Sequence, residues 1–340
     1  MGNLITSVAS YTGKEASFQE TFVLALANNP LLTALGFRIE QDIQSKKTFY
    51  KTARLNKITK AASACVAADT ATGVAISSVV LSVFDMEAQL SQCKSVFEDS
   101  IYEAALKKGY DVYNLEGTQI QTLMLEIFGM AVGNDLYRQM FLNDTTLTNS
   151  DYTAYDGIYK TLLTGALALD GTVRVAATIA DADINSTNIV ATLDTYIAAQ
   201  PSAMKYNISK GDKRFLVTPT VYEAWEMKLT ELGSLESSKV QLIDGVDSLK
   251  FRGIPMVNLQ QVDEYILQDF STASPASSAT MNNRIILTNP QNHIIGTDMM
   301  TDTTNAEFWY ERKDKTNYAR LNYRAGYKYI DGAENVIGGF

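Results

Sequence analysis

The sequence predicts an α+β protein in which a β-ribbon, a long helix and a mixed α/β lobe follow one another along the chain. Three patterns predict this order: strand-like residues from Thr48 to Phe84, apolar residues at helical spacing from Gln119 to Phe141, and alternating short strands and helices after Asn143. The chain has 340 residues, of which 46% are hydrophobic and 20% charged. It is therefore long enough to bury more than one core.

Residues 1–45 are expected to form an N-terminal arm and a helix. Met1–Lys14 has few apolar residues, so this arm needs a neighbour to become ordered. Ser17–Leu35 has the pattern of an amphipathic helix that is interrupted at Asn28–Pro30.

The segment Thr48–Phe84 is expected to form a long two-stranded β-ribbon. Two strand-like halves, Thr48–Thr59 and Val74–Phe84, flank a polar turn at Asp69–Gly73. Such a ribbon is at best marginally stable alone in water, so we expect it to rest on another subunit. Basic side chains would fix the register of the ribbon on the neighbouring subunit, and buried apolar side chains would supply most of the binding energy. The expected contact residues are Lys46, Lys47, Phe49, Tyr50, Lys51, Arg54, Leu55, Lys57 and Lys60. Deleting Thr48–Phe84 is expected to leave a folded subunit that cannot assemble.

Residues 85–149 are expected to be mainly helical. The first helix should run from about Ala88 to Lys108 and end at a glycine. The second, from about Gln119 to Phe141, has the most regular apolar repeat of the chain. Gly129 and Gly133 lie inside it, where we expect another backbone to approach or the helix to bend.

Residues 150–302 are expected to form a compact α/β lobe. A helix begins at Asn185 or Ser186 and ends before Pro201, and the strand Phe215–Val217 leads into a helix that ends at Leu232. Further strands are expected at Gly253–Val257, Arg284–Leu287 and His293–Ile295.

Residues 303–329 return to β-structure. Glu307–Arg312 and Tyr318–Tyr329 alternate polar and apolar residues on either side of Lys313–Lys315. The sequence therefore predicts a hairpin with a charged tip. Residues 330–340 then form the end of the chain.

The composition favours no catalytic or cofactor chemistry. The net charge of −9 disfavours adsorption to DNA or to an anionic membrane, and no apolar run is long enough to cross a bilayer. His293 is the sole histidine, and it is expected to be a core or surface residue rather than a general base. Asp181–Asn185 imitates the start of a calcium loop, but Ser186 and Thr192 stand where glycine and glutamate are needed. We expect no enzyme activity, no metal and no cofactor.

Two cysteines are too few for a disulfide framework and fit folding in a reducing cytoplasm.

This order of elements resembles the HK-97-like capsid fold of tailed-bacteriophage major capsid proteins. Four local matches support it, namely Tyr155–Ile158, Phe215–Pro219, Gly253–Val257 and Asn289–Gly296. Each match is weak alone, and their order over nearly the whole chain gives the resemblance. It implies an N-terminal arm, an extended loop, a peripheral domain with a long spine helix, and an α/β axial domain. In residue numbers these are 1–45, 46–84, 85–149 together with the hairpin 303–329, and 150–302, with 330–340 returning to the axial domain.

The resemblance implies self-assembly. In the family, axial domains meet at five-fold and six-fold centres of an icosahedral shell, peripheral domains meet at local three-folds, and the extended loop lies across the neighbouring subunit. The hairpin tip would then supply the contact residues Glu311, Arg312, Lys313, Asp314 and Lys315. Implied partners are other copies in pentamers and hexamers, together with portal, scaffold and decoration proteins. The shell, assembled in the bacterial host cytoplasm, would enclose double-stranded DNA without reading its sequence.

Several alternatives stay open at this point. Many family members carry a cleaved N-terminal scaffolding segment, for which this sequence has no room, so either a separate scaffold or earlier trimming is expected. Lys46–Lys60 offers amines for the isopeptide bond that links some relatives, without indicating a partner. The rival functions are an encapsulin-like cage around an enzyme cargo and a soluble two-lobe enzyme or ligand-binding protein. Neighbouring genes would separate the first rival, and gel filtration the second.

Overall fold

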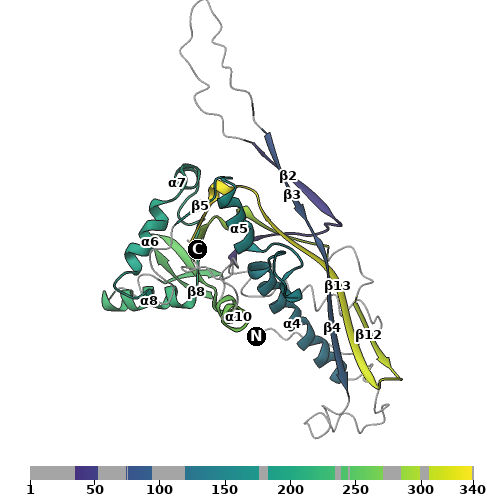
Figure 1. Ribbon diagram of the computed structural model, residues 1–340. Coiled ribbons are helices and arrows are strands. Elements are labelled where there is room, and N and C mark those ends of the chain that lie inside the picture. Colours follow the sequence, from purple (N-terminus) through teal and green to yellow (C-terminus); the bar gives the residue numbers. More distant parts are fainter. Residues whose placement is uncertain are drawn as a thin grey trace, which may run out of the picture.

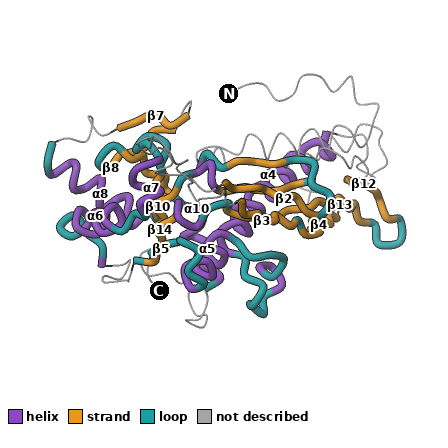
Figure 2. The backbone as a smooth tube through the Cα atoms, turned by 90° about the horizontal axis from the view of Figure 1, so that it is seen from above, coloured by secondary structure: helices purple, strands orange, loops and turns teal. Residues whose placement is uncertain are grey.

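The computed structural model describes residues 35–52, 74, 76–93, 119–175, 183–233, 239–243, 246–270, 285–298 and 306–338. They form two β-sheets and a separate two-stranded ribbon, with helices packed against the sheets (Figure 1). Seen from above, α6 (Ile189–Ala198) and α8 (Pro219–Glu231) lie at one end of the molecule, and β12 (Ala306–Glu311) lies at the other (Figure 2). The subunit is therefore elongated.

The five-stranded sheet is organised around one long strand, β13 (Thr316–Tyr329). This strand pairs antiparallel with β12, with β4 (Phe84–Cys93) and with β11 (His293–Thr297). The short β1 (Arg38–Glu40) lies parallel to β11 at the edge. Residues from both ends of the chain thus meet in one sheet.

The seven-stranded sheet belongs to the α/β lobe. Its order is β5 (Val173–Arg174), β14 (Asn335–Ile337), β10 (Ile285–Thr288), β6 (Arg214–Val217), β9 (Ile254–Asn258), β8 (Val246–Phe251) and β7 (Lys239–Ile243). The other helices are α4 (Gln119–Leu142), α5 (Ile158–Leu167), α7 (Ser202–Asn207) and α10 (Gln260–Asp269), with the 3-10 turns η3 (Ser150–Tyr152), η6 (Pro290–Asn292) and η7 (Gly332–Glu334).

Helix α4 is the spine of the larger hydrophobic core. Phe128, Val132 and Leu136 are buried on the face that meets α10 and β13. The predicted helix Gln119–Phe141 is confirmed, because an apolar repeat of this length is a strong helix signal. Gly129 and Gly133 are buried within it. A close approach or a bend at these glycines stays a prediction.

Most of the later elements are confirmed close to their expected bounds. They are α6, β6, α8, β9, β10, β11 and the hairpin β12–β13. The chain leaves the seven-stranded sheet after β10, forms β11, β12 and β13 of the five-stranded sheet, and returns to the seven-stranded sheet as β14. The domain limits drawn on the sequence stay a prediction.

The predicted helix Ala88–Lys108 is wrong over Ala88–Cys93, because these residues belong to strand β4. Met86, Ala88 and Leu90 face the core in alternation, while the residues between them are mostly exposed. Methionine, glutamate, alanine and leucine favour helices in isolation, but pairing with β13 along the whole of β4 outweighs that preference. The rest of that helix, residues 94–108, lies outside the described residues, as do the predicted arm and helix before Leu35 and the turn Asp69–Gly73.

Leu169 adopts a left-handed backbone conformation just after α5. Its φ is 58°, and its side chain is 88% exposed. The next residue holds the turn in place, because the Asp170 carboxylate accepts hydrogen bonds from the Tyr329 hydroxyl and, at 2.9 Å, from the Thr172 backbone N–H. A leucine at this φ is strained and gains little from burial.

Replacing Leu169 by glycine is expected to raise the free energy of unfolding by roughly 0.5–1 kcal/mol, since glycine adopts positive φ without a Cβ clash. Urea unfolding of the unassembled subunit measures the change. Leu167→Gly is the matched control, because Leu167 is exposed on the last turn of α5, where glycine should destabilise by a similar amount. Equal destabilisation by both substitutions would contradict the strain at Leu169.

Candidate intersubunit surface

The ribbon extends away from the body of the subunit (Figure 1). It consists of β2 (Lys46–Thr52) and β3 (Ile76–Ser82), paired antiparallel from Lys46 opposite Ser82 to Thr52 opposite Ile76. The predicted ribbon is confirmed over these strands. One face of it exposes large apolar side chains, with Tyr50 74%, Ile76 64% and Val80 45% exposed. A cluster of exposed apolar side chains on a thin projection is typical of a surface that a partner covers.

The base of the ribbon, in contrast, packs on its own body. Leu81 is fully buried in a small cluster with Ile43 and Ile294, and Phe49 is partly buried beside them. The guanidinium of Arg38 lies 5.5 Å from the centre of the Phe49 ring. The contact of Phe49 is therefore made within the chain, and the exposed Tyr50, Ile76 and Val80 lie on the opposite face of the ribbon.

Two of the basic contact residues predicted on the ribbon form ion pairs within the chain. Lys47 forms an ion pair with Glu40, and its hydrogen bond, aided by Arg38, lowers the pKa of that carboxyl. Lys51 Nζ lies 2.6 Å from Asp331 Oδ2. Lys46 is exposed at the start of β2. The remaining predicted contact residues of the ribbon lie outside the described residues; they are Arg54, Leu55, Lys57 and Lys60.

The second group of predicted contact residues lies at the tip of the β12–β13 hairpin. Arg312, Lys313, Asp314 and Lys315 are exposed, and Glu311 accepts a hydrogen bond from the Lys313 backbone N–H at 3.2 Å. The tip and the base of the ribbon lie about ten residues apart along β13, which corresponds to roughly 34 Å at about 3.4 Å per residue. The structure therefore places the two groups at opposite ends of one strand.

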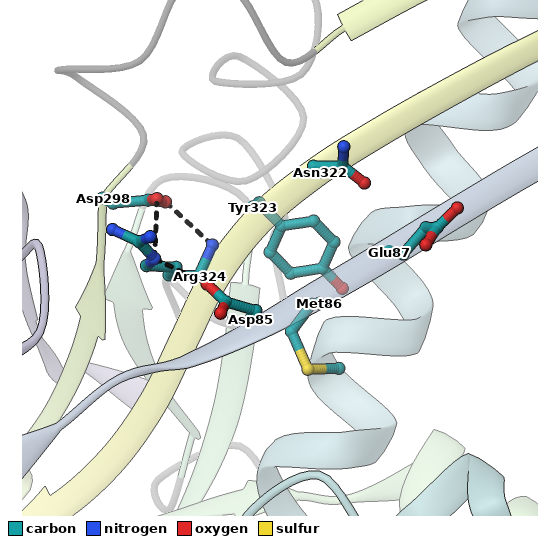
Figure 3. A pocket seen from close by; sticks show the side chains of 7 residues that line it. All are labelled: Asp85, Met86, Glu87, Asp298, Asn322, Tyr323 and Arg324. Carbon is teal, nitrogen blue, oxygen red and sulfur yellow. Dashed lines mark hydrogen bonds and ion pairs between the residues drawn. The ribbon is translucent and has the colours of Figure 1, made fainter.

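A charged hollow of about 470 Å³ lies between them, on the face of β4 and β13. Figure 3 shows its lining side chains, which are Asp85, Met86, Glu87, Asp298, Asn322, Tyr323 and Arg324. Arg324 dominates the hollow, since its Nε lies 2.6 Å from Asp85 Oδ1 and its backbone N–H donates to Asp298 at 2.8 Å. These charges satisfy one another, which is typical of a structural cluster rather than of a ligand site. Within the described ranges, no three His, Cys, Asp or Glu side chains are placed to hold a metal ion.

No family model and no curated protein matches the sequence. Solved structures do match the fold. A chain of the satellite phage P4 procapsid is 10% identical with a TM-score of 0.56, covering 99% of this chain and 94% of that one. A chain of Mycobacterium phage Ogopogo is 12% identical with a TM-score of 0.55, covering 91% of each. A chain from the capsid of an empty GTA particle is 12% identical with a TM-score of 0.51, covering 91% and 89%.

The chain has the HK-97-like capsid fold. In the terms of this fold, α4 is the spine helix, and the ribbon β2–β3 is the start of the extended loop. The α/β lobe corresponds in position to an axial domain. Among the described residues, no helix is both long enough and apolar enough to span a membrane.

His293 belongs to the interior of this capsid fold. It is fully buried at the start of β11, where its ring nitrogens lie 2.5 Å from Thr288 Oγ1 and 2.5 Å from the Tyr327 hydroxyl. Phe37 stacks on the ring at a centroid distance of 4.8 Å. Burial lowers the pKa of His293 to about 3, so the imidazole is neutral near pH 7. Because Thr288 lies on β10 and Tyr327 on β13, His293 joins the two sheets.

Proposed function

We propose that the chain is a structural major capsid protein of a tailed bacteriophage. Many copies form pentamers and hexamers that close into an icosahedral shell around double-stranded DNA. The observation that supports this most is the ribbon, which carries exposed apolar side chains outward on a capsid fold. Covering one such side chain stabilises an interface by about 1.5–3 kcal/mol, and a closed shell repeats the contact many times.

The charge of the chain supports the same function. A net charge of −9 disfavours tight binding of DNA to the shell, which suits packing and release. Portal, scaffold and decoration proteins are the further partners that such a shell needs. The protein would assemble in the bacterial cytoplasm and remain in the virion as its shell. It carries out no catalysis in this function.

Gel filtration with light scattering tests the proposal. The purified chain, supplied with factors from a phage lysate, should elute as particles far heavier than 37.4 kDa or as intermediates leading to them. A protein that stays a monodisperse monomer under all of these conditions would instead favour a soluble enzyme or ligand-binding protein. Particles that enclose an enzyme cargo would favour the encapsulin-like alternative.

Charge reversal at Lys46 is expected to weaken assembly without weakening the fold. Lys46 is exposed on the ribbon, so Lys46→Glu should change the unfolding free energy by less than about 0.5 kcal/mol. Each exposed ion pair between copies contributes only about 0–1 kcal/mol, but every copy in the shell repeats it. The protein concentration at which light scattering detects particles should therefore rise. Lys205→Glu on α7 changes the net charge equally and is the control. Equal effects of both substitutions would exclude a role for Lys46 at the contact.

A further inference from the structure

One arginine contacts the chain both before and after the ribbon, where the ribbon meets the body. The Arg324 Nη1 donates to the Gln44 carbonyl at 2.7 Å, and its Nε pairs with Asp85 at 2.6 Å. Gln44 lies just before β2, and Asp85 lies just after β3. The same guanidinium therefore holds the incoming and the outgoing chain. Asp298 fixes the backbone of Arg324 in turn, and Figure 3 shows the Asp85 and Asp298 carboxylates on either side of it.

A pair of glycines lies directly beneath the base of the ribbon. Gly296 on β11 is in register with Gly326 on β13. A Cβ on Gly326 would lie 2.1 Å from the Ser82 carbonyl oxygen, and a Cβ on Gly296 would lie 2.8 Å from Leu81 Cδ2. Real Cβ atoms do not approach backbone so closely, so the end of β3 can rest on the sheet only if residue 326 lacks a side chain. A Cβ at residue 296 would instead force the buried Leu81 side chain to shift.

We propose that Arg324, Gly296 and Gly326, together the ribbon root, set the direction in which the ribbon leaves the subunit. A two-stranded ribbon has no third strand to fix its angle, so the angle comes from its contacts with the body. The ion pairs of Lys47 with Glu40 and of Lys51 with Asp331 hold one strand, whereas the ribbon root contacts the chain at both ends of the ribbon. The ribbon root supplies a charged clamp on one side and a close backbone contact beneath. That direction is a property of a single chain. Its consequence for assembly rests on the proposed function, because the direction decides where on a neighbour Tyr50 and Ile76 arrive.

A distance measurement across the ribbon root tests the proposal. Spin labels are attached to Cys93, which is exposed at the end of β4, and to a cysteine introduced by Tyr50→Cys, with Cys65→Ser removing the other thiol. Pulsed electron resonance then gives the distribution of distances in dilute, unassembled subunits. The labelled protein without further substitutions, called the parent, should give one narrow distribution of distances. Adding Arg324→Gln should widen this distribution or shift its maximum.

Arg320→Gln is the matched control for the clamp. Arg320 lies on the same strand, and its Nε is 2.9 Å from a Glu87 carboxylate oxygen within β4. Both arginines are partly exposed and form ion pairs with β4, but the pair of Arg320 lies farther from the ribbon base. Arg320→Gln should therefore leave the distance distribution unchanged.

The two glycines give a second, independent arm. Gly296→Ala should shift the distribution, and adding Leu81→Val should partly restore it. This change removes the nearest clashing atom but leaves Val83 Cγ1 at 3.0 Å and Ile43 Cδ1 at 3.1 Å from the added Cβ. Gly326→Ala meets the Ser82 backbone, which Leu81→Val leaves in place, so the same addition should restore nothing there. Gly211→Ala, with no atom within 4 Å of the added Cβ, is the control.

A parental distribution in folded Arg324→Gln and Gly296→Ala subunits would overturn the proposal. Circular dichroism establishes that each variant is folded, and Arg324→Gln keeps the test decisive if a glycine variant is not. The measurement needs no shell. A parent that never forms particles, while its variants shift as expected, would refute the proposed function and leave the role of the ribbon root standing.

Discussion

A subunit with a shortened ribbon should stay folded and form no closed particles. Residues 53–75 are replaced by Asn-Gly, which joins Thr52 to Ile76 through a two-residue hairpin turn. The change keeps Leu81 and Phe49, which stabilise the base, and it also keeps Tyr50, Ile76 and Val80. It removes only residues 53–75 of the predicted extended loop. Circular dichroism and thermal unfolding should match those of the parent, whereas electron microscopy should find no shells.

A second variant keeps the length of the ribbon and removes its apolar surface. Tyr50→Ser with Val80→Ser changes two exposed side chains, so the fold should be unaffected while assembly is lost or needs more protein. Closed particles from the shortened protein would show that residues 53–75 make no necessary contact. Closed particles from the second variant at the parental protein concentration would show the same of Tyr50 and Val80. The longer deletion suggested by the sequence, Thr48–Phe84, is unsuitable because it also removes the buried Leu81 and the start of β4.

Acidification from pH 7 to pH 5 should cost the subunit about 2 kcal/mol of unfolding free energy through His293 alone. The pKa of this residue is about 6.5 in the unfolded chain and about 3 in the folded one. As the pH falls below 6.5, the unfolded state binds a proton that the folded state does not, so stability is lost progressively between pH 6.5 and pH 3. At pH 5 the loss depends little on how far below 5 the folded pKa lies.

Urea unfolding at pH 7, 6 and 5 measures this loss, and His293→Gln is the matched variant. The glutamine amide can replace hydrogen bonds to Thr288 and Tyr327 but does not titrate. The variant should be less stable at pH 7, yet its stability should fall less between pH 7 and pH 5 than that of the parent. Identical slopes for the two proteins would contradict a buried, neutral His293.

Strong local patterns made part of this fold predictable. Three of these patterns depend only on residues close together in the sequence. They are the apolar repeat of α4, the strand followed by proline at the start of α8, and the charged turn between β12 and β13. Strand β4 was missed because its residues favour a helix until β13 pairs with them from more than 220 positions away. The alternation of Met86, Ala88 and Leu90 was the available signal for a strand.

The candidate surface was predictable in outline and not in detail. Exposed apolar residues on the ribbon followed from its two-stranded pattern. Two contacts join residues some 280 positions apart and therefore have no local signal in the sequence. They are the ion pair of Lys51 with Asp331 and the hydrogen bond from Arg324 to the Gln44 carbonyl. Gly326 was not predicted as a contact, although a glycine inside a strand pattern often marks close approach of another backbone.

Cryo-electron microscopy of the assembled protein tests the central claim most directly, namely that the ribbon rests on an adjacent copy. In a closed particle, Tyr50, Ile76 and Val80 should each be covered by side chains of a second subunit, while Leu81 stays buried in its own. Ribbons that remain exposed to solvent in every subunit, or that fold back onto their own body, would contradict the account.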